Sequence, residues 1–329
     1  MLFVIKNATI YLTINWLIGV RVMIKKSENI KPFVKWAGGK NQILDKIKTN
    51  YPKELGKTIN RYCEPFVGGG AVFFDIVSYY NIKEILINDI NEELINTYRI
   101  IKNEVTDLIK LLNLLQEEFV SLSNEKRKEY YYSKRDSFNK LKLNARENIN
   151  IEKATLFIFL NKTCFNGLYR VNSRGLFNVP MGDYKNPIIC DKNNLLTISN
   201  KLKKVTILSR DYSECLEFIN KNTFVYLDPP YRPINATSSF TAYTENNFDD
   251  KEQIRLSYFV NKLNEIGAYV ILSNSDPKNI DKNDNFFEQL YSKYTINKVN
   301  AKRMINCNGK CRGNISELII TNNYGVNAI

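Results

Sequence analysis

The chain has 329 residues, 44% of them hydrophobic, which is enough to bury the core of one large domain or of a domain with a sizeable insertion. Lysine and arginine outnumber aspartate and glutamate by 47 to 34, so the net charge of +13 favours a polyanionic partner such as nucleic acid. A lysine-rich surface without such a partner is the alternative. The sequence contains no histidine, which excludes a Ser-His-Asp triad, a Cys-His pair and histidine-ligated zinc.

The cysteines are scattered along the chain and predict reduced thiols rather than disulfide bonds or a metal site. Only Cys307 and Cys311 lie close together, and no second pair completes a tetrahedral zinc site. We therefore expect no bound metal and a reducing, cytoplasmic environment.

Residues 7–20 form an uncharged, mostly apolar stretch near the N-terminus. This stretch is too short to span a bilayer and contains two Asn and two Thr side chains, and no small-residue cleavage site follows it. We interpret residues 1–23 as an extension produced by translation of an upstream region, with the true start at Met23. A peripheral strand is the alternative.

Short β-branched or aromatic runs alternate with helical stretches, a pattern typical of an α/β fold with a largely parallel sheet. The expected strands are residues 61–66, 84–88, 204–208, 223–227, 268–272 and 315–321. Helices are expected at about residues 72–80, 91–118, 213–221, 250–266 and 278–290. Each strand ends in a polar or glycine-rich turn, and in open α/β sheets ligands bind at these carboxyl ends.

Residues 119–201 interrupt this strand–helix rhythm and predict a second, smaller domain inserted into the first. The first domain would then comprise residues 24–118 and 202–329. The start of the insertion is charged and aromatic, with consecutive tyrosines at 130–132 among lysines and arginines. Taken alone, such a stretch is better explained as the solvated face of a helix than as a binding surface.

A glycine-rich segment, residues 64–70 (EPFVGGG), follows the first strand and opens a helix, so its backbone can approach a ligand. Asp89 lies nineteen residues beyond Gly70, at the end of the next strand, where a carboxylate can accept both hydroxyls of a ribose. Together they predict a cofactor that contains a nucleoside, and a glycine-rich turn beside a helix N-cap is the alternative. The sequence does not contain a phosphate-binding loop, because Asn41 follows Gly39-Lys40 where that pattern requires Ser or Thr. It does not contain the dinucleotide-binding pattern either, because Phe73 stands where that pattern requires glycine.

The most specific motif is Asp228-Pro229-Pro230-Tyr231, which ends the strand at 223–227. An aromatic amine is a poor nucleophile because its lone pair is delocalised into the ring. The Asp228 carboxylate and the Pro229 carbonyl can each accept one N–H of such an amine, which favours a pyramidal nitrogen. Tyr231 can stack on the base, and the two prolines fix the aim of the carbonyl. A turn that ends a strand is the bland interpretation.

Together these residues resemble the DNA adenine methylase family (Dam-like), and most closely its DpnII-type members. The resemblance runs from about Lys31 to the C-terminal strand and departs from the family at Cys164, at Met181 and in the N-terminal 23 residues. It rests on four blocks: residues 31–40 (KPFVKWAGGK), 64–70 with Asp89, 161–172 (NKTCFNGLYRVN) continuing to 177–182 (FNVPMG), and 228–231. It implies a Rossmann-like sheet dependent on S-adenosylmethionine, in which the insertion at 119–201 is a mainly helical target-recognition domain.

The resemblance also implies roles for individual residues. Those implied in catalysis are Asp228, Pro229, Pro230 and Tyr231. Those implied at the cofactor are Trp36, Lys40, Glu64, Pro65, Phe66, Gly68, Gly70, Asp89, Asp211 and Asp228. Those implied in reading or bordering the DNA site, usually GATC in similar enzymes, are Asn166, Leu168, Arg170, Asn172, Pro180 and Tyr184. Arg170 would then contact guanine in a bidentate manner.

The implied reaction extrudes adenine from double-stranded DNA and methylates its N6 amine directly, without a metal or a covalent intermediate. Phe240 and the loop at 238–247 would close over the substrate. We further expect no membrane contact and a nucleoid-associated protein in a prokaryotic or phage-infected cytoplasm. A cognate restriction endonuclease would act in the same system without forming a stable complex.

Two other functions remain open from the residues. An amino methyltransferase that acts on RNA or on a protein amide would use the same pocket, although many such enzymes begin the motif with Asn rather than with Asp228. A catalytically silent DNA-binding protein is the other alternative, although Trp36, Lys40 and Asp89 are all present.

Overall fold

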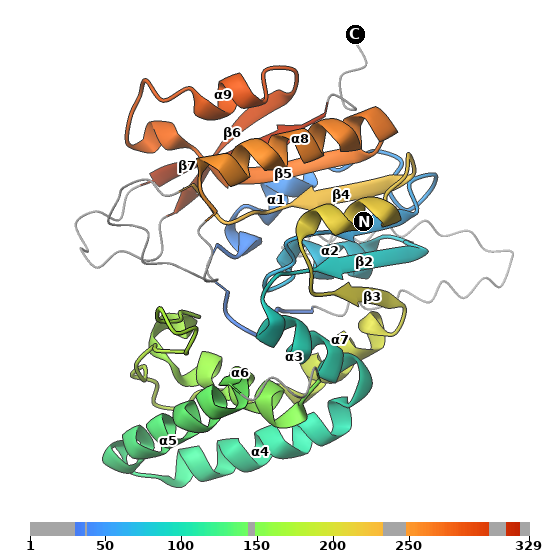
Figure 1. Cartoon of the computed structure of the whole chain (residues 1–329). Helices are drawn as coiled ribbons and strands as arrows, with labels where there is room; N and C mark the ends of the chain where they lie inside the picture. The colour runs from blue at the N-terminus through green and yellow to red at the C-terminus, as the bar shows by residue number, and fades with distance from the viewer. Residues whose placement is uncertain (1–29, 37, 144–148, 233–247, 303–313, 323–329) are drawn as a thin grey trace, which may run out of the picture.

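The computed structural model describes residues 30–36, 38–143, 149–232, 248–302 and 314–322 (Figure 1). A seven-stranded sheet forms its centre, in the order β3-β2-β1-β4-β5-β7-β6. The strands are β1 (Arg61–Glu64), β2 (Glu84–Asn88), β3 (Val205–Leu208), β4 (Thr223–Leu227), β5 (Tyr269–Ser275), β6 (Thr295–Lys302) and β7 (Asn314–Thr321). Strands β1 to β5 run parallel to one another, whereas β7 runs antiparallel to both β5 and β6.

The central strands are buried because their residues are apolar almost without interruption, as expected of a parallel sheet covered on both faces. All five residues of β4 are buried. Strand β3, at the edge, buries only Val205 and leaves its other residues partly or fully exposed. The Rossmann-like α/β fold expected from the sequence is confirmed.

The strand order reverses between β1 and β4, because the chain proceeds from β1 outward to β2 and β3 and then returns to β4 on the other side. In sheets of this kind, the loops at the carboxyl ends of the two strands diverge and leave a crevice for a ligand. The segment after β1 and the motif after β4 therefore face the same crevice.

Helices cover the sheet and form a separate layer beyond β3, at the bottom of Figure 1. The helices are α1 (Leu44–Lys48), α2 (Ala71–Tyr79), α3 (Glu92–Asn103), α4 (Val105–Ser121), α5 (Asn124–Leu143), α6 (Ile151–Thr163), α7 (Lys192–Leu202), α8 (Asp250–Ile266) and α9 (Phe286–Leu290). Helix α6 lies at the centre of the layer, in contact with α3, α4 and α5. Nine of its residues are buried, which matches a helix that is apolar on almost every side.

One hydrophobic cluster extends from the sheet, at Tyr62 and Phe224, to Phe157 and Phe159 of α6. Helix α4 spans the expected domain boundary near residue 118 without a break there. The division into residues 24–118 with 202–329 and an inserted domain at 119–201 therefore remains a proposal.

Three expectations about the elements were wrong. The helix expected at 91–118 is broken at Glu104, which separates α3 from α4 and has a non-helical φ of −134°. The helix expected at 213–221 is a 3-10 helix at Tyr212–Phe218. The helix expected at 278–290 is mostly turn, because Asp and Asn at 281–285 favour side-chain bonds to nearby backbone over helix, so only Pro277–Asn279 and α9 are helical.

Strand β6 was missed, because Thr295–Lys302 is a polar edge strand whose alternation carries little hydrophobic signal. Strand β5 is longer than expected and continues through the buried polar residues Ser273, Asn274 and Ser275. The N-terminal stretch at 1–23, the loop at 238–247 with Phe240, and the pair Cys307 and Cys311 lie outside the described residues. No helix of the described residues is long and apolar enough to cross a membrane.

Candidate active site

The Asp-Pro-Pro-Tyr motif at residues 228–231 begins where β4 ends, and its first side chain contacts a buried lysine. The Lys40 ammonium, from the short 3-10 helix η1 (Lys40–Gln42), lies 2.7 Å from one carboxylate oxygen of Asp228. Lys40 is only 3% exposed and Asp228 20% exposed, so the two charges compensate each other in a largely dry site. The ammonium also donates to the Gly38 carbonyl at 2.7 Å and lies 4.6 Å above the centre of the Tyr231 ring.

The pKa of Asp228 is raised to about 6, because burial disfavours the carboxylate more than Lys40 favours it, while Glu317 repels it. Glu317 comes from β7 and accepts the Tyr231 hydroxyl at 2.7 Å. The Tyr231 ring is thereby fixed between a cation on its face and a carboxylate at its hydroxyl. Sequence reasoning missed Glu317, which is far away in the chain and belongs to no motif.

Two buried side-chain amides hold the Pro230 carbonyl of the motif in place. Gln253 of α8 donates its side-chain amide to the Pro230 carbonyl at 3.2 Å. Asn274 of β5 in turn donates to the Gln253 side-chain oxygen at 3.1 Å, and both amides are fully buried. Pro229 is buried as well, whereas Pro230 is exposed. Neither amide was among the expected site residues.

The glycine-rich loop after β1 is bonded to the carboxylate after β2. The Gly68 N–H donates to one oxygen of Asp89 at 3.0 Å, and the Asn91 N–H donates to the other at 2.9 Å. Burial raises the pKa of Asp89 to about 6 against the opposing effect of these backbone donors. Each carboxylate oxygen keeps a second lone pair with which to accept a hydroxyl.

Glycine is required at two positions of this loop. Gly68 has a φ of +47°, and a Cβ there would lie 2.8 Å from the Trp36 indole. Gly70 has a φ of +76°, and a Cβ there would lie 2.6 Å from the Tyr98 hydroxyl. Both are left-handed conformations in which a side chain is strained, so the loop is shaped for close approach.

Three further expected cofactor residues lie at the same edge of the sheet. Glu64 is buried at the end of β1, accepts the Tyr62 hydroxyl at 2.5 Å, and has a pKa raised well above its usual range by burial. The Pro65 carbonyl accepts the Asn88 side chain at 3.0 Å. The Phe66 ring packs on Tyr212, with ring centres 5.1 Å apart.

Asp211, which follows β3, is already engaged by protein groups. It forms an ion pair with Arg255 at 2.6 Å and accepts the Ser213 N–H at 3.0 Å as an N-cap. Burial would raise the pKa of Asp211, but the bonds from Arg255 and Ser213 outweigh it and lower that pKa. The carboxylate thus orders the turn beside Phe66, and any contact with a cofactor would share it with Arg255.

Trp36 connects the crevice to the helical layer. Its ring stacks on Tyr169 with centres 5.7 Å apart and an interplanar angle of 23°, and it also lies against Phe157 and the backbone of Gly68. The preceding residue, Lys35, is held through its backbone N–H and carbonyl by the Asn161 side chain of α6, each at 2.8 Å.

The six residues implied in DNA reading lie on two segments that pair with each other. Isolated bridges join Cys164 to Met181 and Val171 to Phe177. The six residues are Asn166, Leu168, Arg170 and Asn172 on the first segment, and Pro180 and Tyr184 on the second. The structure therefore brings them to one part of the molecule, beside the crevice.

Their local geometry differs from residue to residue. Asn166 is exposed and has a left-handed φ of 54°, the only such value outside glycine among the described residues. Arg170 donates to the Asn178 side chain at 2.8 Å, so its guanidinium is aligned but not free of protein contacts. Asn172 closes a turn by accepting backbone N–H groups, and the Tyr184 hydroxyl lies 3.1 Å from the Lys35 ammonium.

Among the described residues, no group of His, Cys, Asp and Glu side chains is arranged to hold a metal ion. The four cysteines within that part of the chain, Cys63, Cys164, Cys190 and Cys215, are buried free thiols. The arrangement instead places a carboxylate that can accept an amine N–H, that of Asp228, at the same edge of the sheet as the glycine-rich loop at 64–70. The aromatic rings of Tyr231 and Phe66 belong to these two segments.

Comparison with known families agrees with this chemistry. Residues 36–305 match the model of the D12 class N6 adenine-specific DNA methyltransferases. The chain belongs to this family. The family acts on adenine in DNA, which favours this function over methylation of RNA or of a protein amide, the alternative that the sequence left open.

Curated relatives of this methyltransferase extend over nearly its whole length. The Type II methyltransferase M.MjaIII of Methanocaldococcus jannaschii is 52% identical over 295 residues, 89% of this chain and 99% of that protein. The Type II methyltransferase M1.LlaDCHI of Lactococcus lactis subsp. cremoris is 38% identical over 93% of this chain and 100% of its own. The DNA adenine methylase of Escherichia coli K12 is 33% identical over 90% of this chain and 96% of its own.

Proposed function

We propose that the crevice between β1 and β4 transfers a methyl group from S-adenosylmethionine to the N6 amine of adenine within a specific DNA site. The observation that carries this proposal is the partly buried Asp228 at the end of β4, paired with the buried Lys40 and followed by two prolines and by Tyr231, whose hydroxyl is held by Glu317. The family defines the reaction as adenine-specific DNA methylation, and the donor, the residue roles and the target sequence are the proposed parts.

The residues of the crevice fit S-adenosylmethionine. A nucleoside needs a carboxylate for its ribose hydroxyls and a backbone that it can approach closely, and Asp89 and the loop at Gly68 and Gly70 supply these. Phe66, packed on Tyr212, offers an aromatic face for the adenine ring of the cofactor. When bound, S-adenosylmethionine supplies an electrophilic methyl group on a positively charged sulfur.

The chain's own groups act on the target amine. The Asp228 carboxylate and the Pro229 carbonyl each accept one N–H, which draws the nitrogen lone pair out of conjugation with the ring. Transfer would form the bond between N6 and the methyl carbon while the S–C bond breaks with its electron pair left on sulfur, and the surplus N6 proton would leave to solvent. Tyr231 stacks on the base, and its place is set by Lys40 and Glu317. Fixed acceptors that need no rearrangement lower the barrier by electrostatic preorganisation.

The proposed target is adenine within GATC in double-stranded DNA, extruded from the helix to reach the crevice. Support comes from the two segments with Asn166 to Tyr184, which resemble the recognition segments of Dam-like enzymes and are joined to each other by two bridges. We also propose that the enzyme protects DNA against a cognate endonuclease without a stable complex and acts in a prokaryotic nucleoid, in keeping with relatives named Type II methyltransferases.

Expression in cells that lack adenine methylation, followed by modification-sensitive sequencing of their DNA, tests the target. N6-methyladenine confined to palindromic GATC is the expected result. Adenine methylation at another sequence would overturn GATC as the target but would support the proposed reaction. Methylation of cytosine alone would overturn the proposed reaction.

A further inference from the structure

Helix α5 runs along the second recognition segment and holds it by its backbone. Asn139 both accepts the Phe177 N–H at 2.8 Å and donates to the Phe177 carbonyl at 3.1 Å. The hydroxyl of Tyr131, a fully buried side chain, donates to the Val179 carbonyl at 2.9 Å. Arg127 donates to the Lys185 carbonyl at 2.9 Å.

These three side chains share one face of α5, because residues 127, 131 and 139 are spaced by multiples of four. From residue 127 to residue 139 of the helix, the partner residues run backwards in the sequence from 185 to 177, so the helix and the segment are antiparallel. Arg127 is itself fixed by bonds to the carbonyls of Phe119 and Val120 at the end of α4, at 2.9 and 2.6 Å.

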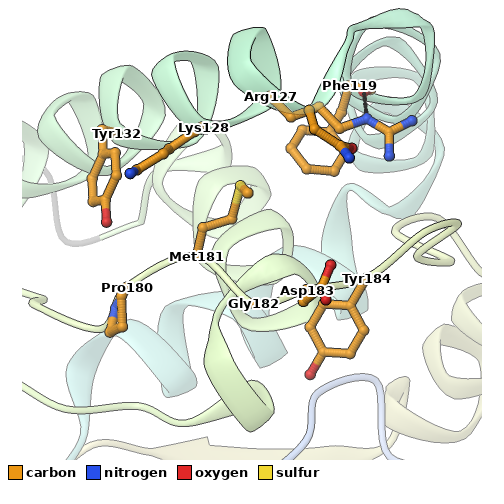
Figure 2. Close-up of a pocket in the computed structure, with 10 residues that line it drawn as sticks. Phe119, Arg127, Lys128, Tyr132, Pro180, Met181, Gly182, Asp183 and Tyr184 are labelled. Atoms are coloured by element: carbon orange, nitrogen blue, oxygen red, sulfur yellow. Dashed lines mark hydrogen bonds between the residues drawn. The ribbon is translucent and has the colours of Figure 1, made fainter.

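The spacing of the attachments shapes the segment between them. From Tyr131 to Arg127 the helix advances only about 6 Å, whereas the six residues from Val179 to Lys185 can extend to about 20 Å. The segment at 180–184 is therefore long enough to arch away from α5, and it does so around a pocket that both elements line. It encloses a pocket of about 390 Å³, with Arg127, Lys128 and Tyr132 on the helix side (Figure 2).

The other side of the arch is attached to the first recognition segment. Gly182 donates its N–H to the Thr163 carbonyl at 2.8 Å, and the Pro180 carbonyl accepts the Phe165 N–H at 2.9 Å. Val179 and Phe177 point inward and are buried, while Pro180 and Asp183 are exposed. A shift of one residue along α5 would exchange the inward and outward side chains.

We propose that α5 is a positioning element that sets the register of the recognition segment, with Asn139 and Tyr131 as specificity-determining residues that never touch DNA. This inference rests on the proposed role of the segments around Asn166 to Tyr184 in reading DNA. Asn139 is the most informative position, because it satisfies both backbone groups of a single residue.

The test measures kcat and KM for a GATC duplex and for duplexes with one altered base pair, using Asn139→Asp and Tyr131→Phe. Asn139→Asp keeps the acceptor for the Phe177 N–H but places an oxygen against the Phe177 carbonyl. Tyr131→Phe removes only the hydroxyl. We expect the ratio of kcat/KM between cognate and altered duplexes to fall about three- to tenfold in each, as loss of one buried hydrogen bond implies. The kcat on saturating cognate DNA should stay within about threefold.

Tyr294→Phe is the matched control, because it removes one hydroxyl bond, to Asn261, at the opposite end of the molecule. It should leave discrimination unchanged. Unaltered discrimination in folded Asn139→Asp and Tyr131→Phe would overturn the positioning role, as would an equal loss of kcat/KM on every duplex. Failure of the underlying function is distinguishable, since the unsubstituted enzyme would then show no preference among the duplexes.

Discussion

Replacing Lys40 with methionine removes the ammonium beside Asp228 while keeping an apolar chain of similar length. The two groups are 2.7 Å apart, and Lys40 opposes the effect of burial that already raises the pKa of Asp228 to about 6. Breaking a buried ion pair by removing one partner costs about 3–5 kcal/mol when the other charge remains. At about 1.4 kcal/mol per pKa unit, this corresponds to a rise of roughly two units or more.

In the proposed mechanism the ionised carboxylate accepts the N–H of the target amine, so activity is expected to fall as pH falls through the pKa of Asp228. With a pKa of about 6, roughly nine-tenths of Asp228 is ionised at pH 7, whereas a pKa near 8 leaves roughly one-tenth. Lys40→Met should therefore lose about tenfold in kcat at pH 7 and recover most of it near pH 9.

The assay is a pH profile of kcat from pH 5 to 9.5 at saturating S-adenosylmethionine and DNA. Stability gives a second readout. The protonated form favours the fold, because the pKa of Asp228 rises from 3.8 to about 6 on folding, so its contribution is present below pH 3.8 and lost as pH rises through 6. The variant should lose more thermal stability at pH 8 than at pH 5. An acid limb at the same pH in both proteins would refute the reasoning.

Three further predictions follow from contacts of the crevice and the helical layer. Gly68→Ala should raise KM for S-adenosylmethionine about tenfold or more with a smaller effect on KM for DNA, because a Cβ there meets an indole ring at 2.8 Å; an equal rise in both constants would contradict this. Gln253→Leu should lower kcat about tenfold with both KM values little changed, since it removes the donor to the motif's carbonyl at 3.2 Å. Lys128→Ala should weaken DNA binding equally on all sequences and reduce the slope of log K against log salt by about 1, whereas Lys221→Ala, at the amino end of the sheet, should not.

Much of the sheet could be predicted because its central strands are short apolar runs that end in polar turns. Residues 223–227 followed by two prolines are the clearest case, and strand and motif were both located from them. Strand β6 could not be predicted, since an edge strand gains its stability from pairing with β7 rather than from its own residues.

The same distinction applies to the site. Asp228 and Asp89 could be located because each follows a strand directly, and residues at the carboxyl ends of neighbouring parallel strands meet. The roles of Gln253, Asn274 and Glu317 could not be predicted from the sequence, because they depend on how α8, β5 and β7 pack behind the motif. No local pattern distinguishes these three from ordinary polar residues.

The ion pair of Lys40 with Asp228 could be predicted only in part. Both residues belong to motifs that the sequence shows, but neither motif indicates that the two side chains are in contact.

The most direct test of the account is mass spectrometry of nucleosides from GATC-containing duplex DNA after incubation with S-adenosylmethionine and either the enzyme or Asp228→Ala. The enzyme should form N6-methyldeoxyadenosine, and the folded variant should form it at least about a hundredfold more slowly, because it lacks an acceptor aimed at the amine. Methylation at the normal rate by Asp228→Ala, or a methylated cytosine as the only product, would contradict the account.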